Sequence, residues 1–408
     1  MSRVIPAIKE RLRRRILAKA PPVDLSRLDR VPDNLVWPLI RDGMEPGARL
    51  ESLRTSGGVH LLTNFLGMRV WLVTGDAETR EVLAAGPERY SNDIRPLMGE
   101  RGSTTDGDIG GLGFTDPPDH TRLRKLLTPE FTMRRLARLT PRIDAIVDEQ
   151  LDQLEAAGPG ADLVTNFAFP IPFRMICELL GLDEEESETF RELGVARFDV
   201  SEGGTGALGA ISGSRAFLMA SCKRQRTDPG PGLIGQIIRE HGDEINDFDL
   251  AGLADGVFTG GLETSASMLS LGTLALLDDG GEYAALGADP LRAGAVVDEL
   301  LRRISVVQVA FPRFPKEPHS IGGHEVRPGD VVLCSLLAAN REQATEASRH
   351  LAFGHGFHRC VGAELARMEL RAAYPALARR FPGLRVVEPP QFRQKSIVFG
   401  VDELRVAW

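Results

Sequence analysis

The stretch Phe353-Gly354-His355-Gly356-Phe357-His358-Arg359-Cys360-Val361-Gly362 determines the fold and the chemistry expected of this sequence. Its glycines at 354 and 356 permit positive φ and let a backbone turn approach another group closely. Residues 361–380 have helical spacing, so Cys360 stands at a helix N-terminus, where free backbone N–H groups and the helix dipole stabilise a thiolate. Such a thiolate is the strong electron-donating axial ligand that a haem iron needs.

A structural role is the alternative for any cysteine, because most cysteines in a core are simply buried. We assign Cys177, Cys222 and Cys334 to that class. The glycines that surround Cys360 argue against the same interpretation there.

Composition sets the broad class of the protein. The chain has 408 residues, 42% of them hydrophobic, 26% charged, and a formal net charge of −8, which is ordinary for a globular protein with a large core. Its four cysteines form no Cys-x-x-Cys pair, which favours a reducing cytoplasm over a disulfide framework or a local zinc site. No apolar run is long enough to span a bilayer, and the acidic balance argues against nucleic acid as a partner.

Several β elements are expected between helices. Alternating β-branched and aromatic residues over 59–74 predict a pair of strands. Residues 321–333, with a Pro328-Gly329 turn, and 396–408, with the pattern of a short hairpin, predict further small sheets. A long loop is expected over 91–113.

Spacings of three and four between apolar residues predict helices over most of the remaining chain. The longest covers 250–277, another covers 291–303, and a helix follows the cysteine loop within 353–381, with Pro375 expected to kink it. A Gly-rich link, 201–209, is expected between helices at 184–194 and 210–226. No linker or repeat divides the chain, so we expect one mainly α domain with small β-sheets over 1–408.

The quoted stretch resembles the cysteine-ligand loop of the cytochromes P450, because it matches Phe-Gly-x-Gly-x-His-x-Cys-x-Gly at every fixed position. Leu365-Ala366-Arg367 is also similar to that family. The resemblance covers nearly the whole chain, with the motifs in the family's order. It implies the cytochrome P450 fold and haem b (iron-protoporphyrin IX) with Cys360 as its thiolate ligand. Phe353, Gly354 and Gly362 are then expected to contact the cofactor.

The helix 250–277 contains Gly260-Gly261-Leu262-Glu263-Thr264. Two glycines inside a helix cost about 1 kcal/mol each relative to alanine, so they need a reason. The hydroxyl of Thr264 can compete for the carbonyl of Gly260 and open the helix locally; the alternative is a close helix–helix contact. The resemblance implies a groove for dioxygen at Gly260 and Gly261, with Glu263 and Thr264 as the acid–alcohol pair that delivers protons.

Four further residues are expected at the cofactor. His120 and Arg124 lie four apart on one helix face and can donate to an anionic group, although a helix start with solvated basic residues has the same pattern. Similarity to the family makes them donors to the haem propionates, together with Arg313 and His358.

One motif is structural, and one segment departs from the family. Glu299-Leu300-Leu301-Arg302 is similar to the family's Glu-x-x-Arg, a buried pair that supports the haem from behind; alone it would be an ordinary surface pair. The family normally has a longer segment before the cysteine loop than residues 342–349, which stand here. That segment normally supplies an arginine that joins the Glu-x-x-Arg pair, and Arg349 is the candidate for this third partner.

The resemblance implies a monooxygenase that inserts one oxygen atom from dioxygen into a small-to-medium hydrophobic molecule. Substrate contacts are expected from 91–113, 184–214, 257–268 and 396–398. Because 408 residues include no reductase domain, electrons are expected from a ferredoxin and an NAD(P)H-driven ferredoxin reductase, with an acidic partner docking near Arg359 and Arg367. Three alternatives stay open: oxidative coupling or rearrangement at the same haem, a catalytically silent homologue that acts as a scaffold, and a haem-based gas sensor, against which the Glu263–Thr264 pair argues.

Overall fold

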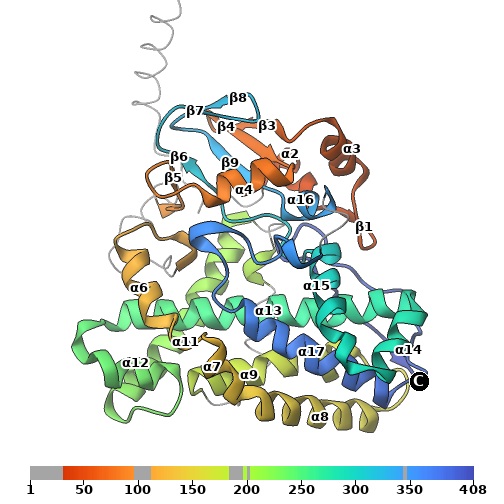
Figure 1. The fold of residues 1–408 in the computed structure, drawn as a ribbon. Helices are drawn as coiled ribbons and strands as arrows, with labels where there is room; N and C mark the ends of the chain where they lie inside the picture. The colour runs from red at the N-terminus through yellow and green to blue at the C-terminus, as the bar shows by residue number, and fades with distance from the viewer. Residues whose placement is uncertain (1–30, 96–111, 183–195, 200–202, 343–346) are drawn as a thin grey trace, which may run out of the picture.

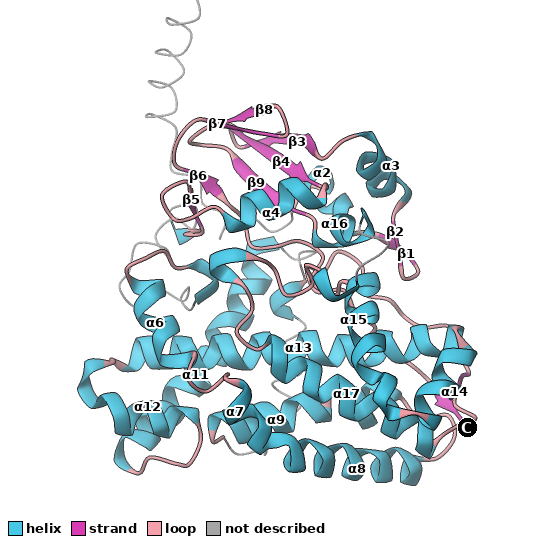
Figure 2. Ribbon diagram, in the orientation of Figure 1, coloured by secondary structure: helices cyan, strands magenta, loops and turns pink. Residues whose placement is uncertain are grey.

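The computed structural model describes residues 31–95, 112–182, 196–199, 203–342 and 347–408. Helices make up most of this part of the chain, and the strands form small sheets, most of them gathered at one end of the molecule (Figures 1 and 2). The predicted fold class, mainly α with small β-sheets, is confirmed.

The bounds of the elements are as follows. The helices are α2 (Asp33–Val36), α3 (Ala48–Ser56), α4 (Asp76–Ala84), α6 (Asp119–Leu127), α7 (Met133–Leu136), α8 (Thr140–Ala157), α9 (Pro170–Leu180), α11 (Gly203–Thr227), α12 (Leu233–His241), α13 (Asp247–Asp278), α14 (Gly280–Ala288), α15 (Ala293–Ile304), α16 (Leu336–Glu342) and α17 (Ala363–Arg380). The strands are β1 (Arg41–Asp42), β2 (Glu45–Pro46), β3 (Val59–Phe65), β4 (Met68–Val73), β5 (Tyr90–Ser91), β6 (Phe314–Pro315), β7 (His319–Ile321), β8 (His324–Val326), β9 (Val331–Cys334), β10 (Arg385–Val386) and β11 (Val406–Ala407).

Helix α13 is the centre of the helical part and crosses it from side to side (Figure 1). It begins after Asn246, whose side chain accepts a hydrogen bond from Asp249 N at 2.7 Å. Asp247 and Asp249 lie in its first turn, where acidic side chains suit the helix dipole. The helix expected over 250–277 therefore extends from Asp247 to Asp278.

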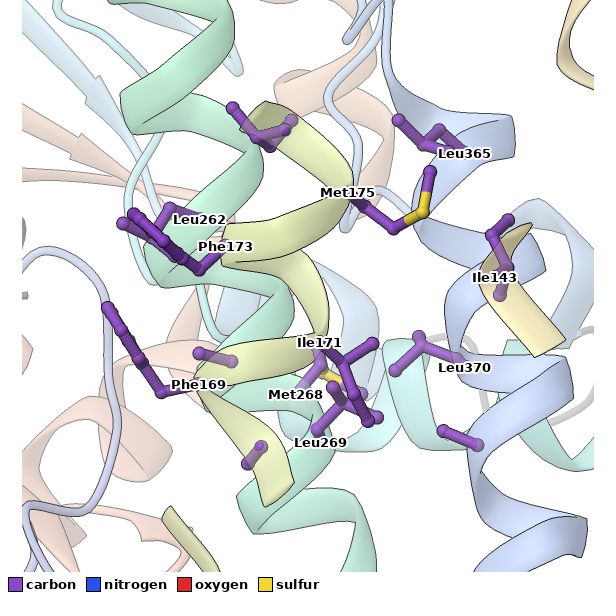
Figure 3. Packing of buried hydrophobic residues seen from close by; sticks show 14 of the residues in the cluster. Ile143, Phe169, Ile171, Phe173, Met175, Leu262, Met268, Leu269, Leu365 and Leu370 are labelled. Carbon is purple, nitrogen blue, oxygen red and sulfur yellow. The ribbon is translucent and has the colours of Figure 1, made fainter. Parts of the chain in front are cut away.

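The core lies where α8, α9, α13 and α17 meet. Figure 3 shows Ile171 beside Met268 and Leu269, and Phe173 beside Leu262, so that α9 packs along α13. Each fully buried side chain of this size contributes about 1.5–3 kcal/mol. This packing fixes the position of α13 relative to α17, which follows the cysteine loop.

Two expectations about local structure were wrong. The part of the Gly-rich link that is described, 203–209, is helical and belongs to α11, because α11 packs along α13 and tertiary packing overrides low helix propensity. The segment 396–408 is not a hairpin: its only strand, β11, pairs with β10, because Ile397 and Phe399 donate instead to Phe198 O and Val306 O.

The main sheet has the order β3-β4-β9. Strands β3 and β4 are antiparallel with Val59 opposite Val73, while β9 runs parallel to β4 with Val70 opposite Val331. Gly329, in the predicted Pro328-Gly329 turn before β9, has φ +91°, a conformation that glycine adopts without strain. Helix α17 continues through Pro375 to Arg380.

Candidate functional site

The cysteine loop folds back on itself before α17 begins. Cys360 N donates to Phe353 O at 2.9 Å and Gly354 N to Leu351 O at 2.8 Å. Gly354 and Gly356 both have φ +69°, as the sequence predicted for a tight turn. A Cβ on Gly356 would lie 2.3 Å from Leu83 O, so this glycine lets the loop press against α4.

Cys360 is exposed, whereas the other three cysteines are buried. Protein nevertheless surrounds the sulfur closely enough that desolvation raises its pKa, while the N–H of Gly362 and the charges of Arg359 and Arg124 act in the opposite direction. A Cβ on Gly362 would be 4.0 Å from Sγ, an ordinary contact. The protein around Gly362 therefore does not by itself require glycine there.

Basic side chains gather beside the loop. His120 is fully buried, and within the described residues neither of its ring nitrogens has a hydrogen-bond partner. Its ring centroid lies 4.4 Å from that of His358. Arg313, which is 4% exposed, donates from Nη1 to Phe311 O at 2.9 Å.

Burial lowers the pKa of each member of this group. Desolvation, followed by the charge of Arg124, lowers the pKa of His120 to about 4. Desolvation, followed by His120 and Arg313, lowers that of His358 to about 3, and Asp116 opposes both effects only partly. A buried imidazole with no partner among the described residues, next to a second imidazole and a buried guanidinium, suits an anionic group between them. The two propionates of a haem have that chemistry, so the residues present fit the cofactor.

Arg124 ties α6 to the cysteine loop. Its Nη1 donates to Phe357 O at 3.2 Å and its Nη2 to Arg359 O at 2.7 Å. The structure therefore brings Arg124 to the predicted site, where it also holds the loop backbone.

The two glycines predicted for one groove on α13 have different neighbours. Gly260 is exposed, and no atom of the described residues would lie within 4 Å of a Cβ on it. On Gly261 a Cβ would lie 2.4 Å from Ile176 Cδ1, so this glycine permits the close approach of α9. Thr264 Oγ1 donates to Gly260 O at 2.6 Å, as its position predicted. Open space thus lies over Gly260, and helix packing explains Gly261.

Glu263 is 2% exposed and forms an ion pair with Arg393. Ser267 Oγ donates to the same carboxyl oxygen at 3.2 Å. Arg393 also donates from Nε to Asp402 at 2.6 Å and from Nη2 to Val401 O at 3.1 Å. The acid predicted to work with Thr264 is therefore neutralised by an arginine that the sequence alone did not single out.

The Glu-x-x-Arg pair is formed, with Arg302 Nε 2.8 Å and Nη2 2.6 Å from the carboxylate of Glu299. Arg302 also donates to Asn340 O at 2.9 Å, and Leu351 N donates to Asn340 Oδ1 at 2.6 Å. The side chain of Glu299 is 47% exposed and that of Arg302 12%, so the expectation of a fully buried pair was wrong for Glu299. The pair supports the cysteine loop through Asn340.

A second ion pair joins α15 to α17. Arg367 Nε donates to Asp298 Oδ1 at 2.8 Å, and His350 Nε2 lies 3.6 Å from the same oxygen. The guanidinium of Arg367 also lies over the ring of Phe353, 4.7 Å from its centroid. Since the side chain of Arg367 is only 11% exposed, its predicted role in docking a partner is poorly supported.

Three polar groups near α13 were missed by sequence reasoning. They are Arg393, the Arg197–Asp255 pair, and Glu369, which is 1% exposed. A charged residue inside an apolar helical stripe, as at Asp255 or Glu369, was an available signal, since burying a charge needs a partner. No local pattern indicated that Arg197 is the partner of Asp255 or that Arg393 is the partner of Glu263.

Comparisons with known proteins agree with the geometry. No protein-family model matches the chain. Cytochrome P450 165C4 of Amycolatopsis orientalis is 40% identical over 354 residues, which cover 83% of this chain and 87% of that protein. The chain belongs to the cytochrome P450 superfamily. It is therefore a monooxygenase of the bacterial type, and the cofactor of its family is a haem with a cysteine thiolate ligand.

Solved structures of the family superpose on this cytochrome P450 over most of its length. The mycinamicin VIII C21 methyl hydroxylase MycCI of Micromonospora griseorubida is 30% identical, with a TM-score of 0.84 over 91% of this chain and 99% of that one. OxyC, implicated in an oxidative C–C coupling reaction during vancomycin biosynthesis, is 36% identical, with a TM-score of 0.79 over 96% of this chain and all of that one. Cytochromes P450 of this type depend on redox partners. In the described part of the chain, no helix has the length and apolar character to cross a bilayer.

Proposed function

We propose that Cys360 is the thiolate ligand of a haem b and that this cytochrome P450 inserts one oxygen atom of dioxygen into a hydrophobic molecule. The observation that carries this is Cys360 itself, an exposed residue on a loop that two glycines with positive φ shape. A haem bound through a thiolate supplies the activation of dioxygen and the oxidation of C–H bonds.

The surrounding residues hold the cofactor. His120, Arg313 and His358 donate to its propionates, which accounts for a buried His120 that has no hydrogen-bond partner among the described residues. Arg124 donates to the same anion or holds the loop carbonyls that frame it. Phe353 and Gly354 contribute to the wall beside Cys360, and Gly362 leaves a flat surface at the start of α17.

Thr264 and Glu263, on α13, deliver protons for the reaction. The hydroxyl of Thr264 holds a proton at Oγ1 and lies beside the open space over Gly260. Glu263, the residue before Thr264, would replace that proton with one taken up from solvent by its carboxylate once the ion pair with Arg393 opens. Gly260 has no side chain to fill the space in which dioxygen would bind.

The substrate is a small-to-medium hydrophobic molecule, contacted by α13 near Gly260 and by the segment around Ile397, which is 36% exposed. Of the expected contacts, those at 96–111, 184–195 and 200–202 lie outside the described residues. Oxidative coupling is the second candidate reaction, because OxyC, a relative over most of the chain, is implicated in such a reaction.

Electrons come from a ferredoxin and its NAD(P)H-driven reductase. Arg359, exposed next to Cys360, is the docking residue best placed for an acidic partner, whereas Arg367 is held by Asp298. The four cysteines, all described and none in a disulfide, are consistent with a cytoplasmic location.

Two measurements test the proposal. The ferrous carbonyl form of the wild-type protein should have the absorption band typical of a thiolate ligand, and Cys360→His should lose that band while it still binds haem. Retention of the band in the variant would refute the assignment of the ligand. With labelled dioxygen, a monooxygenase product contains one labelled oxygen atom and a coupled product contains none.

A further inference from the structure

A second polar cluster lies on α13, upstream of Thr264. Asp255 precedes Thr264 by nine residues, which is about 13 Å along a helix axis. Its neighbour Gly256 is exposed, and within the part of the chain that the structure describes a Cβ there would meet nothing within 4 Å, as at Gly260. The open face of α13 therefore extends from Gly260 back to Gly256, beside the cluster.

Arg197 is the centre of the cluster. Its Nη1 donates to both carboxyl oxygens of Asp255, at 3.0 and 2.9 Å, and to Thr259 Oγ1 at 3.0 Å. Ser214 Oγ, on α11, donates to Asp255 Oδ1 at 2.7 Å. Asp255 is only 1% exposed, so its charge is compensated by one nitrogen of Arg197 and by two hydroxyls.

The backbone beside Arg197 is held by the C-terminal segment. Ile397 N donates to Phe198 O at 3.0 Å and Ser396 Oγ to the same oxygen at 3.1 Å. The segment around Ile397 is also joined to the end of α15, since Gln308 N donates to Ile397 O at 3.0 Å. Arg197 is thus fixed on two sides, and its side chain does not have to be ordered by a ligand.

The second edge of the guanidinium has no hydrogen-bond partner in the described segments of the chain. Among the described residues, every hydrogen bond of Arg197 leaves from Nη1, and the side chain is 14% exposed. Nε and Nη2 therefore present parallel N–H groups in the geometry that binds a carboxylate or a carbonyl oxygen. Because Asp255 already balances the positive charge of Arg197, this edge binds a hydrogen-bond acceptor without attracting anions in general.

We propose that Arg197 is a specificity-determining residue that binds a carboxylate or amide carbonyl of the substrate, about 13 Å along α13 from the position of oxidation. The inference rests on the proposed function, because it names the polar group of a substrate that is otherwise hydrophobic. Because nine residues are about two and a half turns, Asp255 lies about 180° around α13 from Thr264. The substrate then runs from Thr264 along the open face to Gly256 and reaches Arg197 at the edge of that face, where Arg197 contacts Thr259.

Imidazole-ended ligands test the proposal without turnover. The imidazole ligates the haem iron, and a polymethylene chain of varied length ends in a carboxylate, a primary amide or a methyl group. In the wild-type protein, the carboxylate and amide ligands should bind at least 10-fold more tightly than the methyl ligand at one chain length, and this preference should fade at shorter lengths. Binding is read from the shift of the Soret band.

Variants assign the preference to Arg197. Arg197→Gln should remove it, while affinity for the methyl-ended ligand changes less than 2-fold. Because the single change leaves Asp255 buried without its cation, the double variant Arg197→Gln/Asp255→Asn provides a neutral pair that keeps the fold. Asp255→Asn alone should favour the carboxylate over the amide, since Arg197 then has no counter-charge. Arg292→Gln, which removes an exposed arginine paired with Glu282, is the matched control and should change nothing.

The outcomes separate the two proposals. If the methyl-ended ligand produces no Soret shift in the wild-type protein, the haem site itself is wrong. If that shift occurs but no chain length favours the carboxylate or amide, or if the folded double variant keeps the preference, the role of Arg197 is overturned and the proposed function stands.

Discussion

Arg393 forms an ion pair with Glu263 across 130 residues of sequence, between the C-terminal segment and the centre of α13. The guanidinium also contacts Asp402, whose side chain is 58% exposed. Arg393 therefore bridges one buried and one exposed carboxylate, next to the residue proposed to deliver protons. Gly400 packs against it, because a Cβ there would lie 3.1 Å from Arg393 Nη1.

Removing the cation from this pair should destabilise the fold. Arg393→Gln leaves the carboxylate of Glu263 buried without its partner, which typically costs about 3–5 kcal/mol. Arg393→Gln/Glu263→Gln should recover most of the lost stability, because both charges are then absent. Thermal unfolding followed by circular dichroism measures both; a double variant no more stable than Arg393→Gln would contradict the pairing.

Thr264→Ala should leave haem binding intact but divert electrons to peroxide. The hydroxyl is proposed to hold the proton that oxygen cleavage needs, so product formed per NAD(P)H consumed should fall several-fold. Thr273→Ala is the matched control, since Thr273 donates to Leu269 O at 2.8 Å in the same helix with the same spacing. Equal coupling in the two variants would remove Thr264 from proton delivery.

Local signals in the sequence were sufficient for much of the site. The positive φ of Gly354 and Gly356, the hydrogen bond from Thr264 to Gly260, and the extent of α13 each follow from residues within one or two helical turns. Such features depend on backbone geometry and apolar spacing, which a short window contains.

Contacts between distant segments could not be predicted in this way. Nothing near Glu263 or Asp255 indicates that Arg393 and Arg197 supply their counter-charges. The helical glycines of α11 were misinterpreted for the same reason, because packing on α13 rather than propensity decides their conformation. The arginines that pair with these two buried carboxylates were therefore visible only after the fold was known.

His120→Ala should accelerate the loss of haem. The imidazole is proposed to donate to a propionate, and a hydrogen bond to a charged group contributes about 1.5–3 kcal/mol, so transfer to apomyoglobin should be about 10-fold faster or more. His319→Ala, in β7 of a small sheet, where the ring contacts Tyr90, is the control. Equal transfer rates for the wild-type protein and His120→Ala would contradict the assignment.

His350 should make stability fall in mild acid. Desolvation, followed by the charge of Arg367, lowers the pKa of His350 from 6.5 to about 4. Between these values the unfolded chain binds more protons than the folded one, so folding stability present above pH 6.5 is lost as the pH falls to about 4, by up to about 3 kcal/mol. His350→Asn should flatten this part of the profile of melting temperature against pH; an unchanged slope would exclude His350 as its source.

Glu369 should have the opposite effect at higher pH. Desolvation raises the pKa of its carboxyl to about 8, and Ser265 only partly opposes the shift. Within the described residues its Oε2 has no hydrogen-bond partner, so the neutral acid is the form that the core accommodates. The folded protein then holds a proton that the unfolded chain releases above the ordinary carboxyl pKa of 4.5. The stability that this group contributes therefore falls as the pH rises from 4.5 to about 8.

Glu369→Gln introduces an uncharged side chain of the same shape. This variant should be more stable than the wild-type protein at pH 8, with a difference that shrinks toward pH 5. If the two melting temperatures run parallel over that range, Glu369 is ionised in the folded protein and has a partner that its surroundings do not indicate.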